Sequence, residues 1–243
     1  MRLTRVYVGA PLEPGRRVTL QGGAASHITR VLRLRVGEAL TVFNGLGGQY
    51  EASIDKSHGG EVTVSVGEHS PAERESPLTL TLAQGISRGE RMDLVMQKAT
   101  ELGVSRLVPV LTERSVVRLD ARQADRKADH WRRIAIGACE QCGRNRLPQV
   151  LRPLPLTEFL GEMNGASAGL LLSPEAASRI DDLPRPVAGL TVLIGPEGGL
   201  AQAEVQAALA AGFTAVRLGP RVLRTETAAI AALTLLQRQF GDL

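Results

Sequence analysis

The sequence predicts an α/β protein, in which a small β-barrel domain precedes a larger domain built on a mostly parallel sheet with helices on both faces. Three observations lead to this prediction. About the first 70 residues contain short β-rich runs separated by glycine turns, whereas the remainder alternates short apolar runs with helical patterns. The charged, proline-bounded stretch Pro71–Pro77 lies between the two patterns and is typical of a linker. We therefore expect two domains, at residues 1–72 and 73–243.

In the first domain, the strands are expected where β-forming residues lie between glycine-rich turns. One helix, at about Ala24–Leu34, interrupts them, and the turn Asn44–Gly48 joins two of them. Several short strands with tight turns are typical of a small barrel, a common RNA-binding module. The expected strands are Arg5–Val8, Arg17–Leu20, Ala39–Phe43, Tyr50–Ile54 and Glu61–Val66.

In the second domain, continuous apolar runs predict buried strands, and ligands of such parallel sheets bind beyond the carboxyl ends of the strands. The expected strands are Leu78–Ala83, Leu107–Leu111, Ala168–Leu172, Thr191–Ile194 and Ala215–Leu218. The expected helices are Arg91–Leu102, Ala124–Gln141, Gln202–Ala211 and Glu226–Phe240. Each is followed by a glycine suited to a helix C-terminus, namely Gly103, Gly143, Gly212 and Gly241.

The last expected helix, Glu226–Phe240, is apolar nearly all round. A helix without a polar face is buried on more than one side. It could lie at the centre of the sheet packing or contact another subunit, and we favour the subunit contact.

The composition excludes several classes of protein. Hydrophobic residues make up 43% of the 243-residue chain, which excludes wholesale disorder, and no apolar run is long enough to cross a bilayer. The start of the chain is charged and lacks the apolar core of a signal peptide, and two cysteines suit a reducing compartment. We therefore expect a cytoplasmic protein without a membrane segment.

The basic charge is carried almost entirely by arginine, since only three of the 29 Lys and Arg residues are lysines. A net charge of +4 does not by itself identify a nucleic-acid-binding protein, and codon bias explains the arginine excess at least as well. The arginines do cluster, and a guanidinium suits phosphate recognition. Aromatic residues amount to only 3%, which argues against a stacking platform for long single strands.

Several common sites are not indicated. Cys139 and Cys142 form a C-x-x-C pair, but no paired histidine or further cysteine completes a zinc site, so we interpret them as structural and expect no metal. The four histidines are scattered, and no serine lies in a glycine-flanked elbow. The glycines at Gly45–Gly48 are not followed by a helix, so a dinucleotide fingerprint is excluded.

Two segments do suggest a binding site. Ile194–Leu200 lies between an expected strand and an expected helix, and its three glycines let the backbone approach a ligand closely. Leu218–Ala228 has the same place after the next strand, with Thr225 as expected N-cap and Glu226 in the first helical turn. Two loops at one edge of a sheet make a pocket with polar and apolar walls, suited to an adenosine moiety.

These loops also carry a resemblance. Gly195–Gly199 together with Leu218–Thr227 looks like the signature of the knotted SPOUT methyltransferases, and the chain resembles the ribosomal RNA small subunit methyltransferase E family within that class. The likeness extends over nearly the whole chain, including His27–Arg33, Gln97–Val104, Glu113–Ser115 and Glu140–Arg144. The family makes N3-methyluridine in 16S ribosomal RNA from S-adenosylmethionine.

The resemblance implies a PUA-like barrel in residues 1–72, a trefoil-knotted domain in residues 73–243 and a homodimer. One departure is Ala201, where the family usually has Ser or Thr, so that only Glu204 of a capping box remains. The residues expected to hold S-adenosylmethionine are Leu172, Ser173, Ile194, Gly195, Pro196, Gly198, Gly199, Leu218, Gly219, Leu223, Thr225 and Thr227.

Methylation of uracil N3 requires loss of the N3 proton and stabilisation of the resulting anion. We expect Arg224 to stabilise the anion and Glu197 or Glu226 to act as the base. The expected contacts to 16S ribosomal RNA in the small subunit are Arg5, Arg30, Arg33, Arg114 and Arg144. Two alternatives stay open: a non-catalytic RNA-binding assembly factor of the ribosome, and an enzyme that uses another adenine nucleotide.

Overall fold

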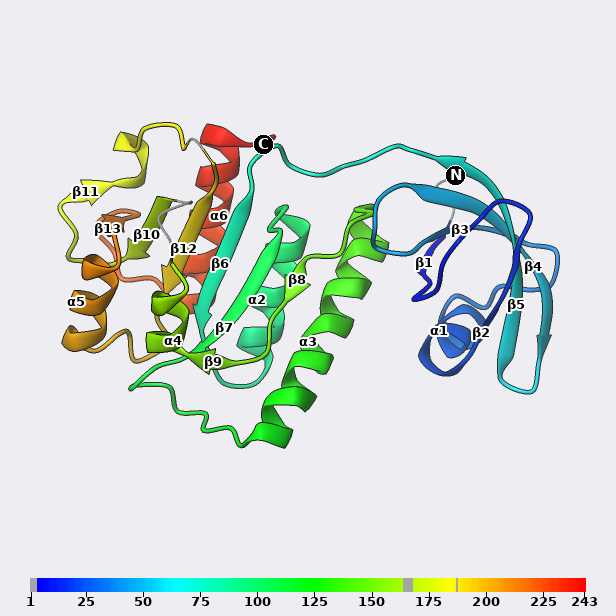
Figure 1. Ribbon diagram of the computed structural model, residues 1–243, viewed down its shortest axis with the longest axis horizontal. Coiled ribbons are helices and arrows are strands. Elements are labelled where there is room, and N and C mark those ends of the chain that lie inside the picture. The colour runs from blue at the N-terminus through cyan, green and yellow to red at the C-terminus, as the bar shows by residue number, and fades with distance from the viewer. Residues whose placement is uncertain (1–3, 164–167, 187) are drawn as a thin grey trace. The chain divides into compact units, whose positions relative to one another are not determined.

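The computed structural model describes residues 4–163, 168–186 and 188–243 (Figure 1). The first residues of the chain, on which the expectation about export partly depends, lie outside this description. The chain forms two compact units: unit 1 contains the chain up to Glu75 together with Ile136–Leu147, and unit 2 contains Ser76–Ala135 and Pro148–Leu243. The proposed domain limits, at residues 72 and 73, did not anticipate the second segment of unit 1.

Unit 1 contains a five-stranded sheet in the order β1-β3-β4-β5-β2. The first pair, β1 with β3, is parallel, and the other pairs are antiparallel. Inward-facing Leu40, Val42, Ile54 and Val64 form its core. The strands are β1 (Arg5–Tyr7), β2 (Arg17–Leu20), β3 (Ala39–Phe43), β4 (Gln49–His58) and β5 (Glu61–Ser70). Each lies at a predicted position, but β4 and β5 run four residues beyond the predicted ends. Strands β1 and β2 form the two edges of the sheet.

The predicted helix of unit 1 is present in two short pieces. Helix α1 covers Gly22–Ser26, and the π-helical turn η1 continues it over His27–Val31. Within them, Ala25 and Ile28 face the core of unit 1. Arg33, shortly after the turn, has a φ of 55°, a left-handed backbone that non-glycine residues adopt at a cost.

The stretch expected to be a linker is anchored within unit 1 as far as Glu75. Two nitrogen atoms of Arg144 donate to Glu75 Oε2, at 2.6 and 2.9 Å. Asn145 Nδ2 donates to the carbonyl of Ala72 at 2.6 Å, and Glu73 accepts a hydrogen bond from the Gly48 N–H at 2.7 Å. The sequence suggested that the charged side chains of this stretch are solvated. In the structure, Glu75 instead binds the segment that follows helix α3 (Ala121–Cys142).

Unit 2 contains an eight-stranded parallel sheet, in which β11, β13, β10, β12, β6, β7 and β8 follow one another and β9 also pairs with β7. The long strands are β6 (Leu80–Gly85), β7 (Arg106–Leu111), β10 (Ala168–Leu172), β12 (Leu190–Ile194) and β13 (Phe213–Arg217). The short ones, which the sequence did not predict, are β8 (Gln149–Val150), β9 (Leu154–Pro155) and β11 (Ser178–Arg179).

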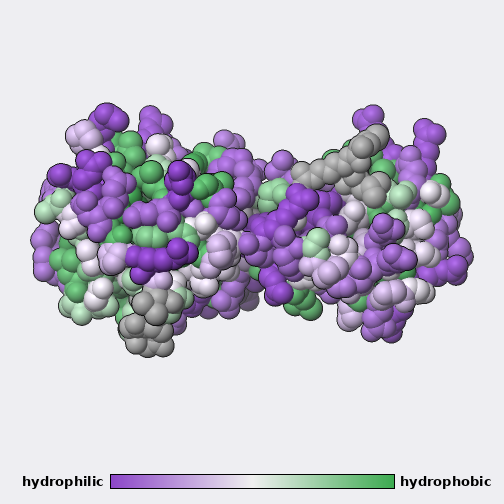
Figure 2. All heavy atoms as spheres, turned by 90° about the horizontal axis from the view of Figure 1, so that it is seen from above, coloured by the Kyte–Doolittle hydropathy of each residue, from purple (hydrophilic) through white to green (hydrophobic). Residues whose placement is uncertain are grey.

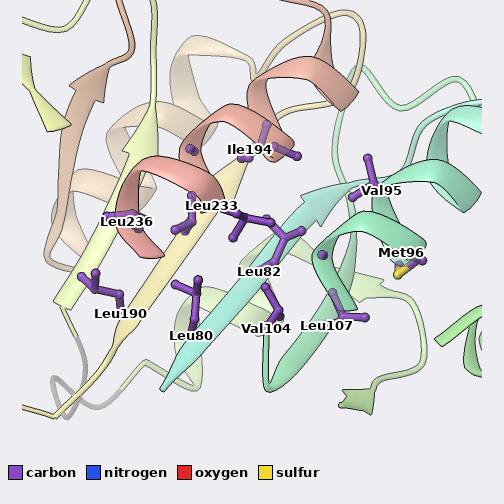
Figure 3. Packing of buried hydrophobic residues seen from close by; sticks show 14 of the residues in the cluster. Leu80, Leu82, Val95, Met96, Val104, Leu107, Leu190, Ile194, Leu233 and Leu236 are labelled. Carbon is purple, nitrogen blue, oxygen red and sulfur yellow. The ribbon is translucent and has the colours of Figure 1, made fainter. Parts of the chain in front are cut away.

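Helices cover both faces of this sheet, because successive strand residues point to opposite sides. Leu82 and Val192 pack with helices α2 and α6, whereas Ala83 and Leu193 pack with α4 and α5. Figure 3 shows Leu233 and Leu236 of α6 above the leucines of β6 and β12. The helices are α2 (Glu90–Glu101), α4 (Leu156–Gly161), α5 (Gln202–Ala210) and α6 (Thr225–Phe240), with a short 3-10 turn, η2 (Ile180–Asp182). The short α4 and η2 were not predicted.

The predicted glycines follow the ends of all four helices. Gly103, Gly143 and Gly212 have left-handed φ angles of 79°, 94° and 89°. Gly241 is the C-cap of α6, with a φ of −108°. The Gly241 N–H still bonds to the carbonyl of Gln237, which completes the last turn without a left-handed residue.

The surface is mixed in character. Hydrophilic residues (purple) are interspersed with apolar ones (green) on the faces of both units seen in Figure 2. Over the described ranges, no helix combines the length and the apolar character needed to cross a membrane.

The C-x-x-C pair lies at the end of α3 within unit 1. Cys139 is buried, and burial raises the pKa of its thiol to about 12, against a smaller opposing effect of Arg144. The Cys139 Sγ donates to the carbonyl of Arg146 at 3.7 Å. Cys142 is partly exposed, and neither cysteine forms a disulfide in the described part of the chain.

These surroundings predict unequal thiol reactivity. Because the thiolate is the reactive species, iodoacetamide at pH 8 should alkylate Cys142 first and leave Cys139 unmodified until the protein unfolds. Peptide mass spectrometry over a time course, with a urea-treated sample as control, measures both sites. Early labelling of Cys139 in the folded protein would contradict its burial.

Candidate functional site

The candidate site is a pocket at the carboxyl edge of the unit 2 sheet. The neighbouring strands β13, β10 and β12 all end there, and the loops that follow them form its walls together with the first turn of α6. The pocket has a volume of about 830 Å³, which lies within the range of small-molecule sites. Parallel strands thus bring together loops that are distant in the sequence.

Nearly all residues expected to bind a cofactor line this pocket. Leu172 and Ser173 come from the end of β10, the glycine loop from the end of β12, and Leu218, Gly219 and Leu223 from the loop after β13. Of the expected set, Thr227 does not line the pocket, because it lies on the exposed side of the first turn of α6. The three expected catalytic residues, Arg224, Glu197 and Glu226, line it as well.

Glycine is required in this loop because backbone segments approach closely. A Cβ atom at Gly195 would lie 2.9 Å from the carbonyl carbon of Gly199, and one at Gly85 would lie 2.5 Å from Pro196 Cδ. Gly199 has a left-handed φ of 69°. The sequence drew attention to the loop glycines but not to Gly85, which ends β6 beneath them.

Polar contacts hold the glycine loop in place. Glu197 Oε1 accepts hydrogen bonds from Arg91 Nη1 at 2.9 Å and from the Arg88 N–H at 3.1 Å. Partial burial alone would raise the pKa of Glu197, but these bonds and one from its own backbone outweigh burial and lower that pKa. Arg114 Nη1 donates to the carbonyl of Gly198 at 3.1 Å. Arg91, which lines the pocket, was missed because nothing in its helical context distinguishes it.

The helix after the glycine loop has the half capping box expected from Ala201. The Ala201 N–H donates to Glu204 Oε2 at 2.8 Å, and Ala201 offers no side-chain oxygen in return. The other oxygen of Glu204 accepts a hydrogen bond from the Glu113 N–H at 2.8 Å. One carboxylate therefore orders both the start of α5 and the loop after β7.

The prediction that Thr225 is an N-cap is wrong. Thr225 begins α6, and Arg224 occupies the cap position without a side-chain capping bond. The Thr225 hydroxyl donates instead to the carbonyl of Gly195 at 2.7 Å, and it accepts a hydrogen bond from Gln84 Nε2 at 2.8 Å. Gln84, which is 1% exposed, was not among the expected site residues, because a single glutamine in an apolar strand carries no motif.

The charge around the pocket is mainly positive, because the arginines that line it outnumber the glutamates. Arg224 is exposed and has no hydrogen bond or ion pair through its side chain within the described part of the chain. Glu226 Oε2 is shielded from solvent and is without a partner there. The lining residues concerned are Arg91, Arg114, Arg217, Arg221, Arg224, Glu175, Glu197 and Glu226.

Two arginines expected to contact RNA are buried inside unit 1. Arg5 is 9% exposed and donates to Asn145 Oδ1 at 2.7 Å and to Gln49, and Arg144 is 4% exposed and paired with Glu75. The guanidiniums of Arg5 and Arg144 thus have partners within unit 1, and RNA contact by these two residues stays a prediction. In contrast, Arg30 and Arg33 are exposed, as is Arg114 at the pocket.

No group of three or more His, Cys, Asp or Glu side chains suited to a metal ion occurs in residues 4–163, 168–186 and 188–243.

Comparisons with known proteins assign both units. The family model of an RNA methyltransferase domain matches residues 74–237, and that of an RNA methyltransferase PUA domain matches residues 20–67. The ribosomal RNA small subunit methyltransferase E of Buchnera aphidicola is 33% identical over 100% of this chain and 98% of its own length. The protein of that name from Bacillus subtilis is 30% identical over 94% of this chain and 92% of its own.

Solved structures agree with this assignment. A methyltransferase from Legionella pneumophila, in complex with its bound cofactor S-adenosylmethionine, has a TM-score of 0.96 and 43% identity. A ribosomal RNA small subunit methyltransferase E from Neisseria gonorrhoeae, bound to S-adenosylmethionine, has a TM-score of 0.92 and 38% identity. Each match covers 100% of both chains. The predicted mostly parallel sheet with helices on both faces, preceded by a PUA-like domain, is confirmed. The chain belongs to the ribosomal RNA small subunit methyltransferase E family.

Proposed function

We propose that this protein transfers a methyl group from S-adenosylmethionine to N3 of a specific uridine in the 16S ribosomal RNA of the small ribosomal subunit. It acts as a homodimer in the cytoplasm. The observation that carries the proposal is the pocket that three loops form at one edge of the sheet. The chain is similar over its full length to proteins whose structures contain S-adenosylmethionine.

The pocket residues fit this cofactor in size and chemistry. Gly195 and Gly198 line the pocket without side chains, so that polar atoms of an adenosine can reach the backbone there, and Leu172, Leu218 and Leu223 provide apolar walls. Glu226 Oε2, shielded from solvent and without a partner in the described residues, is a polar atom that a bound molecule can satisfy. The cofactor residues proposed are therefore those of the expected set that line the pocket, without Thr227.

When bound, S-adenosylmethionine supplies an activated methyl group on its sulfonium. The residues of the pocket then have to align the acceptor nitrogen with that group and remove its proton. Of the two candidate bases, Glu226 is the better placed, because Glu197 is committed to Arg88 and Arg91 and its lowered pKa weakens it as a base. Arg224, exposed and without a side-chain partner, stabilises the negative charge that develops on the uracil.

The target uracil has to leave its base pair, because N3 lies on the pairing edge. Arg114 lies at the pocket and can bind a phosphate near the target base, while Arg30 and Arg33 of unit 1 bind phosphates elsewhere on the RNA. The left-handed backbone of Arg33 supports a role there, since strained residues cluster at functional sites.

The proposed homodimer rests on helix α6. Its inner face, with Leu233 and Leu236, is buried in unit 2, but Ile230 and Ala231 are only partly covered and Leu235 is 37% exposed. A second subunit would cover this apolar outer side. In that arrangement the pocket, which includes the first turn of α6, lies close to the subunit boundary.

The central test uses methyl-labelled S-adenosylmethionine and small subunits from cells that lack this modification. We expect label in N3-methyluridine after digestion of the 16S ribosomal RNA and mass spectrometry of the nucleosides. Label in another nucleoside would overturn the assignment of the target atom. Absence of both label and cofactor binding would favour a non-catalytic, RNA-binding assembly factor.

The roles of the pocket side chains can be separated kinetically. Glu226→Gln should lower kcat by about a hundredfold or more, because it removes the proton acceptor, while cofactor affinity changes little. Arg224→Ala should likewise lower turnover far more than cofactor affinity. Glu197→Gln should mainly weaken cofactor binding, because it loosens the glycine loop. Equal losses of kcat and cofactor affinity in Glu226→Gln or Arg224→Ala would contradict the proposed roles.

The RNA contacts can be tested through salt dependence. Arg33→Asn removes the charge while asparagine tolerates the left-handed backbone, so the fold is retained. The slope of log K against log salt should fall by roughly 0.7–0.9, the contribution of one phosphate contact. Arg16→Gln is the matched control, because Arg16 is an exposed arginine of the same unit that pairs with Glu13. An unchanged slope in Arg33→Asn would remove this residue from the RNA surface.

A further inference from the structure

The pocket depends on a buried polar connection that no part of the proposed reaction uses directly. Gln84 lies on β6 next to Ile194 of β12, and it is 1% exposed in an otherwise apolar stretch of strand. It is not among the residues that line the pocket. Burying an amide lowers stability, because the group loses its hydration, unless its hydrogen bonds within the protein compensate for that loss.

The hydrogen bonds of Gln84 reach both walls of the pocket. Its Nε2 atom donates to Thr225 Oγ1 at 2.8 Å and to the carbonyl of Gly85 at 3.0 Å, and it lies 3.4 Å from the carbonyl of Gly195. The Thr225 hydroxyl donates to the same Gly195 carbonyl at 2.7 Å. Gln84, Gly195 and Thr225 therefore form a closed triangle between β6, the glycine loop and the start of α6.

The orientation of the amide follows from its partners. Carbonyl oxygens only accept hydrogen bonds, so the atom facing Gly85 and Gly195 has to be the nitrogen. The Oε1 atom of Gln84 has no partner in the part of the chain that the structure describes. The donors of Gln84 are thus the groups that connect the segments, and a carboxylate of the same length could not replace them.

We infer that Gln84 is a positioning residue that holds the glycine loop after β12 against the first turn of α6. This inference rests on the proposed function, because these two segments carry the proposed cofactor contacts at Gly195–Gly199 and the flanking residues Arg224 and Glu226. With Gln84 in place, the loop and the helix keep a fixed separation before any ligand arrives. Such preorganisation lowers the ordering cost of binding.

The test compares the wild-type protein with Gln84→Met and Gln84→Glu. Methionine keeps the approximate shape without donors, and glutamate places acceptors against the Gly195 carbonyl. Hydrogen–deuterium exchange should become faster in peptides covering 194–200 and 224–228, on the order of tenfold for Gln84→Met and more for Gln84→Glu. In calorimetric titration, the Kd for S-adenosylmethionine should rise on the order of tenfold for Gln84→Met.

Gln237→Met is the matched control. Gln237 is also a fully buried glutamine of unit 2, and it bonds to Ser76 and to the carbonyl of Leu102, away from the pocket. Loss of the Gln237 amide should lower the unfolding temperature and leave hydrogen–deuterium exchange in the pocket segments and cofactor affinity unchanged.

Steady-state kinetics of Gln84→Met should show the change mainly in KM for the cofactor rather than in kcat.

Thr225→Val provides a second approach if Gln84 variants fold poorly. It removes the hydroxyl that donates to the Gly195 carbonyl and accepts from Gln84, so it should accelerate exchange in 194–200. In the double variant, its effect should not add to that of Gln84→Met. Unchanged exchange in both pocket segments of a folded Gln84→Met would overturn the inference. Failure of the wild-type protein to bind S-adenosylmethionine would instead count against the proposed function, while the exchange data still decide the role of Gln84.

Discussion

The pocket depends on the close approach of backbone segments at the carboxyl ends of β6 and β12. At Gly85 and Gly195 a single methyl group would collide with the neighbouring chain, so the loop lies where it does only because both positions lack a side chain. Parallel pairing of β6 and β12 brings these two glycines to the same edge of the sheet. The polar contacts of Glu197, Arg114 and Gln84 then hold a loop whose path is already restricted by sterics.

The same arrangement separates structural charge from charge available for chemistry. Glu197 is neutralised by Arg91, and Arg5 and Arg144 are satisfied within unit 1. Arg224 and Glu226, which flank Thr225 at the start of α6, are left without such partners in the described residues. A charged group without a partner in the fold can interact with a substrate without first breaking an internal ion pair. These two side chains are therefore the best candidates for the reaction.

Sequence periodicity predicted most of the fold, because the long strands and helices have strong local hydrophobic patterns. The strand Ala168–Leu172 and the helix Gln202–Ala210 are found almost where apolar runs and helical spacing predicted them. The short strands β8, β9 and β11 and helix α4 were missed, because two to six residues carry no period. The pocket loops were predictable from their glycines, whereas Gln84 and Gly85 were not, because their importance comes from tertiary contact with a loop more than a hundred residues later.

The surroundings of Arg5, Arg144 and Thr225 differ from the sequence-based expectation for one physical reason. In each case the side chain has a plausible local role, as a surface cation or a helix cap, but a distant partner satisfies it instead. Arg5 donates to Asn145 Oδ1 and to the carbonyl of Arg144, and the guanidinium of Arg144 binds Glu75. A cluster of arginines therefore indicates RNA contact only after the acidic and carbonyl groups that the fold brings to it have been counted. Arg30 and Arg33, which are exposed, stay candidates for RNA contact; Arg114 is also exposed but already donates one hydrogen bond to the carbonyl of Gly198.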